Sequence, residues 1–173
     1  MFLKKYIIIV FSIFIVSLPA KSQSVEYFVK ASFIEKFARF TDWESNAASE
    51  NFVICVLGKS PFHKELEELS RKTKIKEKSL KIIYLNDYHN ISDCQVLFIC
   101  SSETDNLDSI IGFLKNRNVL LVSDTPGFSQ KGVHFNFFIA RNGTIRFEIN
   151  LKALVKSNLK TDMQLLSIGK IVD

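Results

Sequence analysis

The sequence predicts an α/β fold: a single three-layer domain with a mixed, mostly parallel sheet flanked by helices. Continuous apolar runs at 52–57, 96–99 and 119–122 are typical of strands buried on both faces, and helical segments alternate with them. The pattern then changes to two strands around Asn142-Gly143 and two final helices. We therefore expect a C-terminal β-hairpin and two terminal helices.

The N-terminus has the layout of a secretory signal peptide. Two lysines precede an apolar run over 6–18, and Ala20 and Ser22 supply the small residues of a cleavage site. An uncut membrane anchor is the alternative, but the run is shorter than the roughly 20 residues of a spanning helix. The predicted domains are 1–22, a signal peptide cleaved after Ser22, and 23–173, the α/β domain.

The first segment of the mature chain predicts an amphipathic helix over 25–43. Glu26 with Lys30, and Glu35 with Arg39, form i,i+4 pairs on the side we expect to be wetter. The opposite side carries aromatic residues at helical spacing: Phe28, Phe33, Phe37 and Phe40.

Later elements follow from caps and apolar runs. Ser60-Pro61 is expected to start a helix that ends near Arg71. Ser101 is expected to start another helix, which ends near Asn116. A charged turn and a strand are expected at 74–78 and 80–85. The hairpin strands are expected at 133–140 and 144–150. The last two helices are expected to begin at Asn150, as a cap, and at a capping box of Thr161 with Gln164.

The hairpin contains charges that a buried strand does not explain. If Asn142-Gly143 is a two-residue turn, Arg146, Glu148 and Asn150 share one face with apolar residues. A buried charge needs a partner, so two interpretations stay open. In the first, the charges are satisfied within the fold: Arg146 pairs with Glu148 at a sheet edge, or Glu148 accepts hydrogen bonds from the N-terminal amides of a helix. In the second, all three residues contact a small ligand. Asn150 is favoured as a helix cap.

Composition excludes several classes of function. Removal of the signal peptide takes three lysines away, and 23 minus 3 leaves 20 basic residues against 18 acidic ones. The net charge of the mature chain is therefore small, and we expect no nucleic-acid partner. No phosphate loop, nucleophile elbow or metal-ligand spacing is present. We predict no catalytic residue, metal or cofactor, and hence no enzyme. Three cysteines in an exported chain favour one disulfide and one free thiol.

Several stretches together resemble one family. They are 29–40 followed by Trp43, 52–58 with Pro61-Phe62, 94–99, 122–124 and 146–151. In order and spacing these stretches are similar to the YfiR-like family of periplasmic proteins, from about residue 26 to the C-terminus.

This resemblance implies a periplasmic regulator that binds and represses the periplasmic segment of an inner-membrane signalling protein. That partner is expected to be a diguanylate cyclase, whose release raises cyclic di-GMP and favours biofilm. The alternative is a small-ligand-binding sensor domain that works with a sensor histidine kinase. The resemblance also implies a homodimer and a disulfide between Cys55 and Cys94, while Cys100 lies outside the family pattern.

Two candidate sites follow. The four phenylalanines of the first helix are a candidate partner or dimer surface, with core packing as the alternative use of most of them. Arg146, Glu148 and Asn150 are candidate ligand contacts, and the resemblance favours this for Glu148 because small ligands bind near the hairpin in the family.

Overall fold

An eight-stranded mixed sheet forms the middle layer of the protein. Its strands are β2 (Asn51–Leu57), β3 (Lys74–Ile75), β4 (Lys78–Leu85), β5 (Val96–Ile99), β6 (Leu120–Ser123), β7 (Phe135–Ile139), β8 (Ile145–Asn150) and β10 (Lys170–Val172). Their order is β10-β8-β7-β6-β5-β2-β4-β3. All neighbours pair in parallel except β3 with β4 and β7 with β8. This confirms the predicted α/β class with a mostly parallel sheet.

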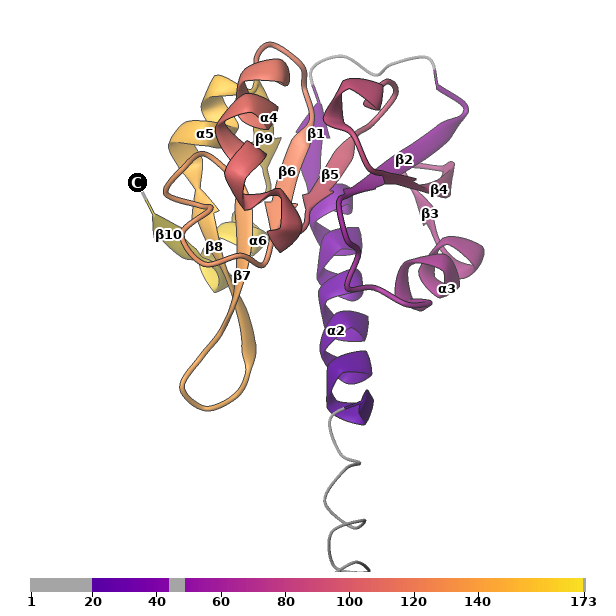
Figure 1. The fold of residues 1–173 in the computed structure, drawn as a ribbon, viewed down its shortest axis with the longest axis vertical. Coiled ribbons are helices and arrows are strands. Elements are labelled where there is room, and N and C mark those ends of the chain that lie inside the picture. The colour runs from indigo at the N-terminus through magenta and orange to yellow at the C-terminus, as the bar shows by residue number, and fades with distance from the viewer. Residues whose placement is uncertain (1–19, 44–48, 173) are drawn as a thin grey trace, which may run out of the picture.

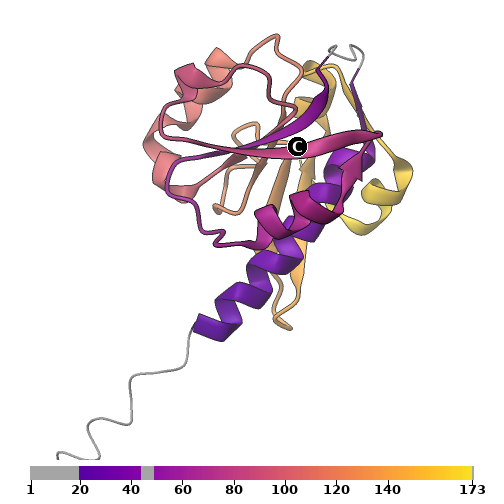
Figure 2. The same cartoon turned by 90° about the vertical axis from the view of Figure 1, so that its right-hand side faces the viewer.

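Helices cover the sheet, as Figure 1 shows for the computed structural model, which describes residues 20–43 and 49–172. The helices are α2 (Ala20–Arg39), α3 (Glu65–Lys72), α4 (Leu107–Phe113), α5 (Leu151–Lys156) and α6 (Met163–Ile168). A second, two-stranded sheet joins β1 (Thr41–Trp43) to β9 (Leu159–Thr161). Figure 2 shows that α2 continues past the edge of the large sheet. Residues 1–19 of the predicted signal peptide lie outside the described residues, and the expected cleavage after Ser22 falls in the first turn of α2.

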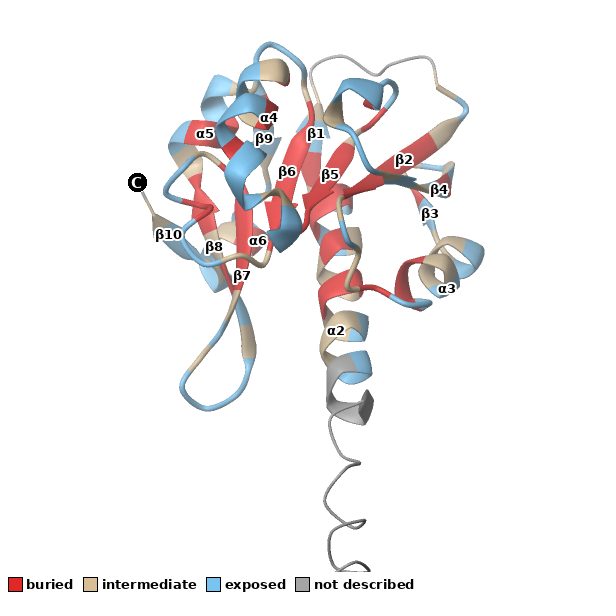
Figure 3. Cartoon of the chain, viewed as in Figure 1, coloured by how far each residue is buried: buried red, intermediate tan, exposed pale blue. Residues whose placement is uncertain are grey.

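The two faces of the sheet carry separate apolar cores. Alternate residues of β2 point to opposite sides, so Ile54 and Val56 join the core under α2 and α3 while Leu57 joins the core under α4. Figure 3 shows the central strands as buried. Phe37 is the centre of the first core and stacks on Phe135 with ring centroids 4.3 Å apart. Burial on both faces explains the continuous apolar runs of the sequence.

The order of the parallel strands reverses at β2, which lies between β4 and β5. Open α/β sheets bind ligands at such a reversal, outside the carboxyl ends of the strands. Here a side chain fills the crevice: a Cβ on Gly58, which has φ +91°, would lie 2.3 Å from Ser102 Oγ. The backbone N–H of Lys59 also donates to that hydroxyl at 2.9 Å. A ligand at this edge must therefore bind beside the reversal.

Several element boundaries differ from the prediction. The first helix ends at Arg39, and Trp43 belongs to β1. The helix expected from Ser60-Pro61 begins only at Glu65, because the Ser60 hydroxyl accepts from the N–H of Phe62 and forms a local turn.

At the end of the chain, Thr161 belongs to β9 and Asp162 caps α6, accepting the N–H of Gln164 at 2.7 Å. A further short strand that we did not expect, β10, follows α6 and pairs in parallel with β8.

The register of the hairpin corrects the predicted two-residue turn. The loop closes between the N–H of Ala140 and the carbonyl of Thr144, so Phe138 faces Arg146 and Asn136 faces Glu148. Residues that lie opposite each other in the hairpin share a face of the sheet, so this one-residue shift changes which side chains lie together. The apolar odd-numbered residues of both strands face the first core. The even-numbered residues occupy the other face: Asn136, Phe138, Arg146, Glu148 and Asn150.

Candidate functional site

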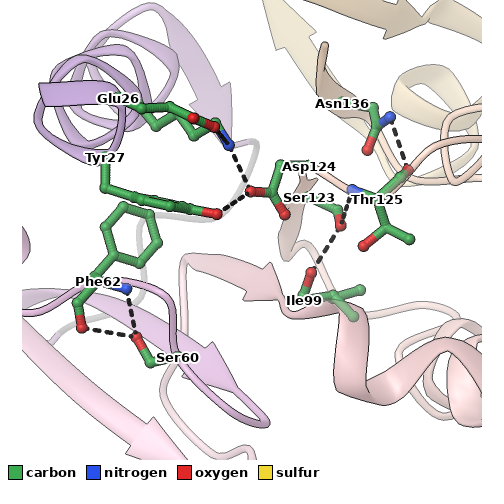
Figure 4. A network of polar contacts seen from close by, with 10 residues as sticks. Glu26, Tyr27, Ser60, Phe62, Ile99, Ser123, Asp124, Thr125 and Asn136 are labelled. Atoms are coloured by element: carbon green, nitrogen blue, oxygen red, sulfur yellow. Dashed lines mark hydrogen bonds and ion pairs between the residues drawn. The ribbon is translucent and has the colours of Figure 1, made fainter. Parts of the chain in front are cut away.

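A cavity of about 760 Å³ opens at the carboxyl end of β6, between α2 and the β7–β8 hairpin. Figure 4 shows much of its polar wall, in which side chains from α2 meet the loop that follows β6. We call this cavity the polar pocket. It is defined by Tyr27, Lys30, Asp124, Thr125, Asn136 and Glu148.

Lys30 is the most deeply buried charge of the polar pocket, with only 4% of its surface exposed. Its ammonium lies 2.6 Å from Asp124 Oδ2 and 2.5 Å from Glu26 Oε1. A buried ammonium is stable only when such partners replace the water it has lost. The Glu26–Lys30 pair was predicted, but its position on the wetter side was wrong for Lys30, because the aliphatic stem runs inward toward the sheet edge.

Tyr27 adds a second contact to the same carboxylate. Its hydroxyl donates to Asp124 Oδ2 at 2.9 Å, and its ring packs edge-on against Phe62 with centroids 5.1 Å apart. Burial and the charge of Asp124 raise the pKa of Tyr27 well above its usual range, so the phenol stays protonated and keeps donating. Asp124 thus holds α2 against the end of β6 through two side chains.

Two oxygen atoms of the polar pocket are buried without a partner among the described residues: Thr125 Oγ1 and Asn136 Oδ1. Asn136 is 1% exposed, and its Nδ2 donates to the carbonyl of Thr125 at 3.0 Å. A carbonyl can only accept, so this contact fixes the amide orientation and leaves Oδ1 as the free acceptor. An unsatisfied buried acceptor costs about 1–3 kcal/mol. A ligand N–H or O–H would remove that cost.

Glu148 lies on the hairpin side of the polar pocket. It accepts a hydrogen bond from the hydroxyl of Ser129, and its Oε1 lies 3.0 Å from Lys170 Nζ. Burial alone would raise the pKa of Glu148, but these contacts outweigh it and hold the pKa below its usual range. The carboxylate is therefore ionised at neutral pH. Its partners differ from those we expected, which were Arg146 or helix amides.

The structure separates the three candidate ligand residues of the hairpin. Glu148 borders the polar pocket, whereas Arg146 is exposed and contacts the carbonyl of Ile168 at 3.5 Å. Asn150 caps α5, as the favoured interpretation predicts: its Oδ1 accepts the N–H of Ala153 at 2.8 Å. Only Glu148 therefore remains a candidate contact for a ligand in this pocket.

The four phenylalanines of α2 do not form one surface. Phe37 is fully buried, which corrects its assignment to a contact surface, and Phe33 and Phe40 are partly buried against the same core. Phe28 is 58% exposed, one turn after Val25, which is 66% exposed. The exposed apolar part of the helix is therefore its N-terminal end.

All three cysteines are buried free thiols in this structure. The neighbouring Cys94 thiol lowers the pKa of Cys55, while burial raises the pKa of Cys94. Cys94 Sγ also contacts the carbonyl of Val96 at 3.1 Å. Burial raises the pKa of Cys100 to about 12, so this thiol is unreactive at neutral pH. The expected Cys55–Cys94 pairing stays a prediction.

Residues far apart in the sequence build this site, and sequence reasoning missed most of them. Lys30 and Asp124 are separated by 94 positions, and neither carries a motif. The sequence signals were indirect: the i,i+4 spacing of Glu26 and Lys30, and the resemblance stretches 29–40 and 122–124, which contain Lys30 and Asp124. Within residues 20–43 and 49–172, no helix is long and apolar enough to cross a membrane. The same residues contain no group of three or more acidic, histidine or cysteine side chains that could hold a metal ion.

The fold and the polar pocket define an α/β domain with a ligand-sized hollow at the carboxyl edge of its sheet. The family model described as YfiR/HmsC-like matches residues 27–170 of this chain. The protein therefore belongs to the YfiR/HmsC-like family. A search of curated proteins finds no match.

Proposed function

We propose that this protein is a periplasmic, non-enzymatic regulator that binds and represses the periplasmic segment of an inner-membrane signalling protein, a diguanylate cyclase. The observation that carries this proposal is the match to the YfiR/HmsC-like family across 27–170. Export depends on the signal peptide proposed for 1–22, cleaved after Ser22. Because the mature domain would act outside the cytoplasm, its effect on cyclic di-GMP must pass through a partner that crosses the membrane.

The N-terminal end of α2 is the surface we propose for the partner. Val25 and Phe28 lie three positions apart on one helical face, and both remain exposed. A homodimer that uses this same surface is the competing arrangement. Partner binding would act by stabilising one state of the cyclase through differential affinity.

Cellular cyclic di-GMP tests this proposal. Deletion of the gene should raise the nucleotide, and the wild-type chain should restore its level. Phe28→Glu should fail to restore it because the charge would be buried in the contact. Val155→Glu is the matched control, since Val155 is 73% exposed on α5. An unchanged cyclic di-GMP level after deletion would contradict the regulatory role, and equal complementation by both variants would contradict the surface.

A second function, ligand sensing together with a sensor histidine kinase, is favoured by one observation. The buried Asn136 Oδ1 and Thr125 Oγ1 atoms lack partners and line the polar pocket. Thermal shifts with small metabolites that carry N–H or O–H donors should identify a stabilising ligand. The shift should disappear in Asn136→Ala and persist in Arg146→Ala, which removes a hairpin side chain outside the pocket. Equal responses of the two variants would rule out this site.

A further inference from the structure

A second cavity, of about 540 Å³, lies between α4, α5 and the amino ends of β6 and β7. We call it the basic pocket because five cationic residues line it and no aspartate or glutamate is among its lining residues. The cations are Lys115, Arg117, Lys131, Lys152 and Lys156. They come from three separate segments of the chain, so the fold, and not a local charge run, brings them together.

Some cations elsewhere on the described surface lie beside carboxylates. Lys76 pairs with Asp42, and Lys170 pairs with Glu148. By contrast, the ion pairs found within the described residues include none for Lys115, Lys131 or Lys156. Because every charged residue that lines the basic pocket is a cation, the pocket has a positive potential that attracts anions.

Arg117 is held in place before any ligand arrives. Its Nη1 donates to the carbonyl of Ile91 at 2.9 Å, and its guanidinium lies 4.3 Å from the centre of the Phe113 ring. A guanidinium fixed by stacking and a hydrogen bond loses little entropy when it binds an anion. This side chain therefore gives the basic pocket one preorganised cation among more flexible lysines.

The base of the basic pocket carries an oriented hydroxyl donor. His134 is 1% exposed, and its Nδ1 accepts the N–H of Leu121 at 2.8 Å. Burial lowers the pKa of His134 to about 4, so the neutral ring carries its proton on Nε2. That nitrogen lies 3.0 Å from Ser157 Oγ and donates to it. Ser157 Oγ accepts this bond and keeps its own proton to donate into the pocket.

We propose that the basic pocket binds a small phosphate monoester. The lysines and Arg117 would surround the phosphate dianion, and the Ser157 hydroxyl would donate to one of its oxygens. Apolar side chains of Val119, Leu121 and Ala153 line the same hollow and would contact the organic part. The volume is also in the range of small-molecule sites and larger than a phosphate group alone needs. This site is independent of the regulatory function proposed above.

Isothermal titration of the mature protein with glycerol 3-phosphate, at low salt, tests the proposal. Glycerol is the neutral control, and inorganic phosphate separates the anion from the organic part. We expect binding of glycerol 3-phosphate, weaker binding of inorganic phosphate and none of glycerol. The double variant Lys115→Gln/Lys156→Gln should weaken binding about tenfold or more, because hydrogen bonds from charged groups are the stronger ones.

Two further variants show whether the pocket itself is responsible. Lys81→Gln removes an equally exposed lysine from β4, far along the sheet, and should bind like the wild type. Ser157→Ala should weaken binding; because it also removes the acceptor of the buried His134 Nε2–H, its binding is measured well below the midpoint of its thermal unfolding. Absence of binding, equal losses in the Lys81 and Lys115/Lys156 variants, or binding only to vesicles containing anionic phospholipid would each overturn the proposal.

Discussion

Replacing Lys30 by Met should destabilise the protein more than any other single change of a charge in α2. The Coulomb attraction over the 2.6 Å to Asp124 is about 6 kcal/mol at an effective dielectric constant of about 20. Desolvation offsets much of this attraction in the native protein. In Lys30→Met, however, Asp124 keeps its own desolvation cost, with its side chain only 12% exposed. Breaking a buried pair in this way costs about 3–5 kcal/mol, and we expect a value near the lower end because Tyr27 still donates to Asp124.

Urea unfolding at pH 7 measures this loss. Lys36→Met is the control, because Lys36 is exposed on the same helix and Lys and Met have similar helix propensities. It should change the free energy of unfolding by less than about 0.5 kcal/mol. The double variant Lys30→Met/Asp124→Leu should recover part of the loss, since no buried charge then lacks its partner. Equal losses in Lys30→Met and Lys36→Met would refute the structural importance of the buried pair.

Further predictions concern the cores and the thiols. Burial lowers the pKa of His134 from 6.5 to about 4, so the unfolded chain binds more protons between these values. Stability should therefore fall by about 3 kcal/mol as the pH decreases through this window, and unfolding curves of His134→Gln should lack that slope. Phe37→Ala should cost about 3–5 kcal/mol and Phe28→Ala less than about 0.5 kcal/mol, both measured by urea unfolding. Peptide mapping of exported protein without reductant should find Cys55 linked to Cys94, and a link from Cys55 to Cys100 would contradict the pairing.

The central strands could be predicted because a strand that is buried on both faces consists of consecutive apolar residues, and such runs are visible in the sequence. β2, β5 and β6 lie within a residue of their expected positions. The short strands β1, β9 and β10 could not be predicted, since each has only three residues and forms through pairing with a distant segment. Such pairing is a tertiary effect that overrides local preference.

The hairpin shows how one local error changes a functional prediction. Asn142-Gly143 suggested a two-residue turn, but the loop is longer, and Gly143 adopts φ +79° within it. A shift of one residue exchanges the residues that face each other. In the true register, Glu148 faces Asn136, and Arg146 faces Phe138. The polar pocket could not be derived from the incorrect register.

The two pockets are neighbours, and one short segment separates them. Gln130 lines both, and Ser129 connects them: its hydroxyl donates to Glu148, while its carbonyl accepts from Asn150 Nδ2 at 2.7 Å. Their charges are opposite in sign, because carboxylates outnumber the one cation around the polar pocket, whereas the charged residues of the basic pocket are all cations. Any ligand that moves Ser129 or Gln130 in one pocket changes the free energy of binding in the other, and this coupling is reciprocal. The surface proposed for the partner lies on α2, which Lys30 and Tyr27 join to Asp124 at the wall of the polar pocket. In the regulator proposed above, a ligand in the polar pocket would act on the membrane partner through the position of α2.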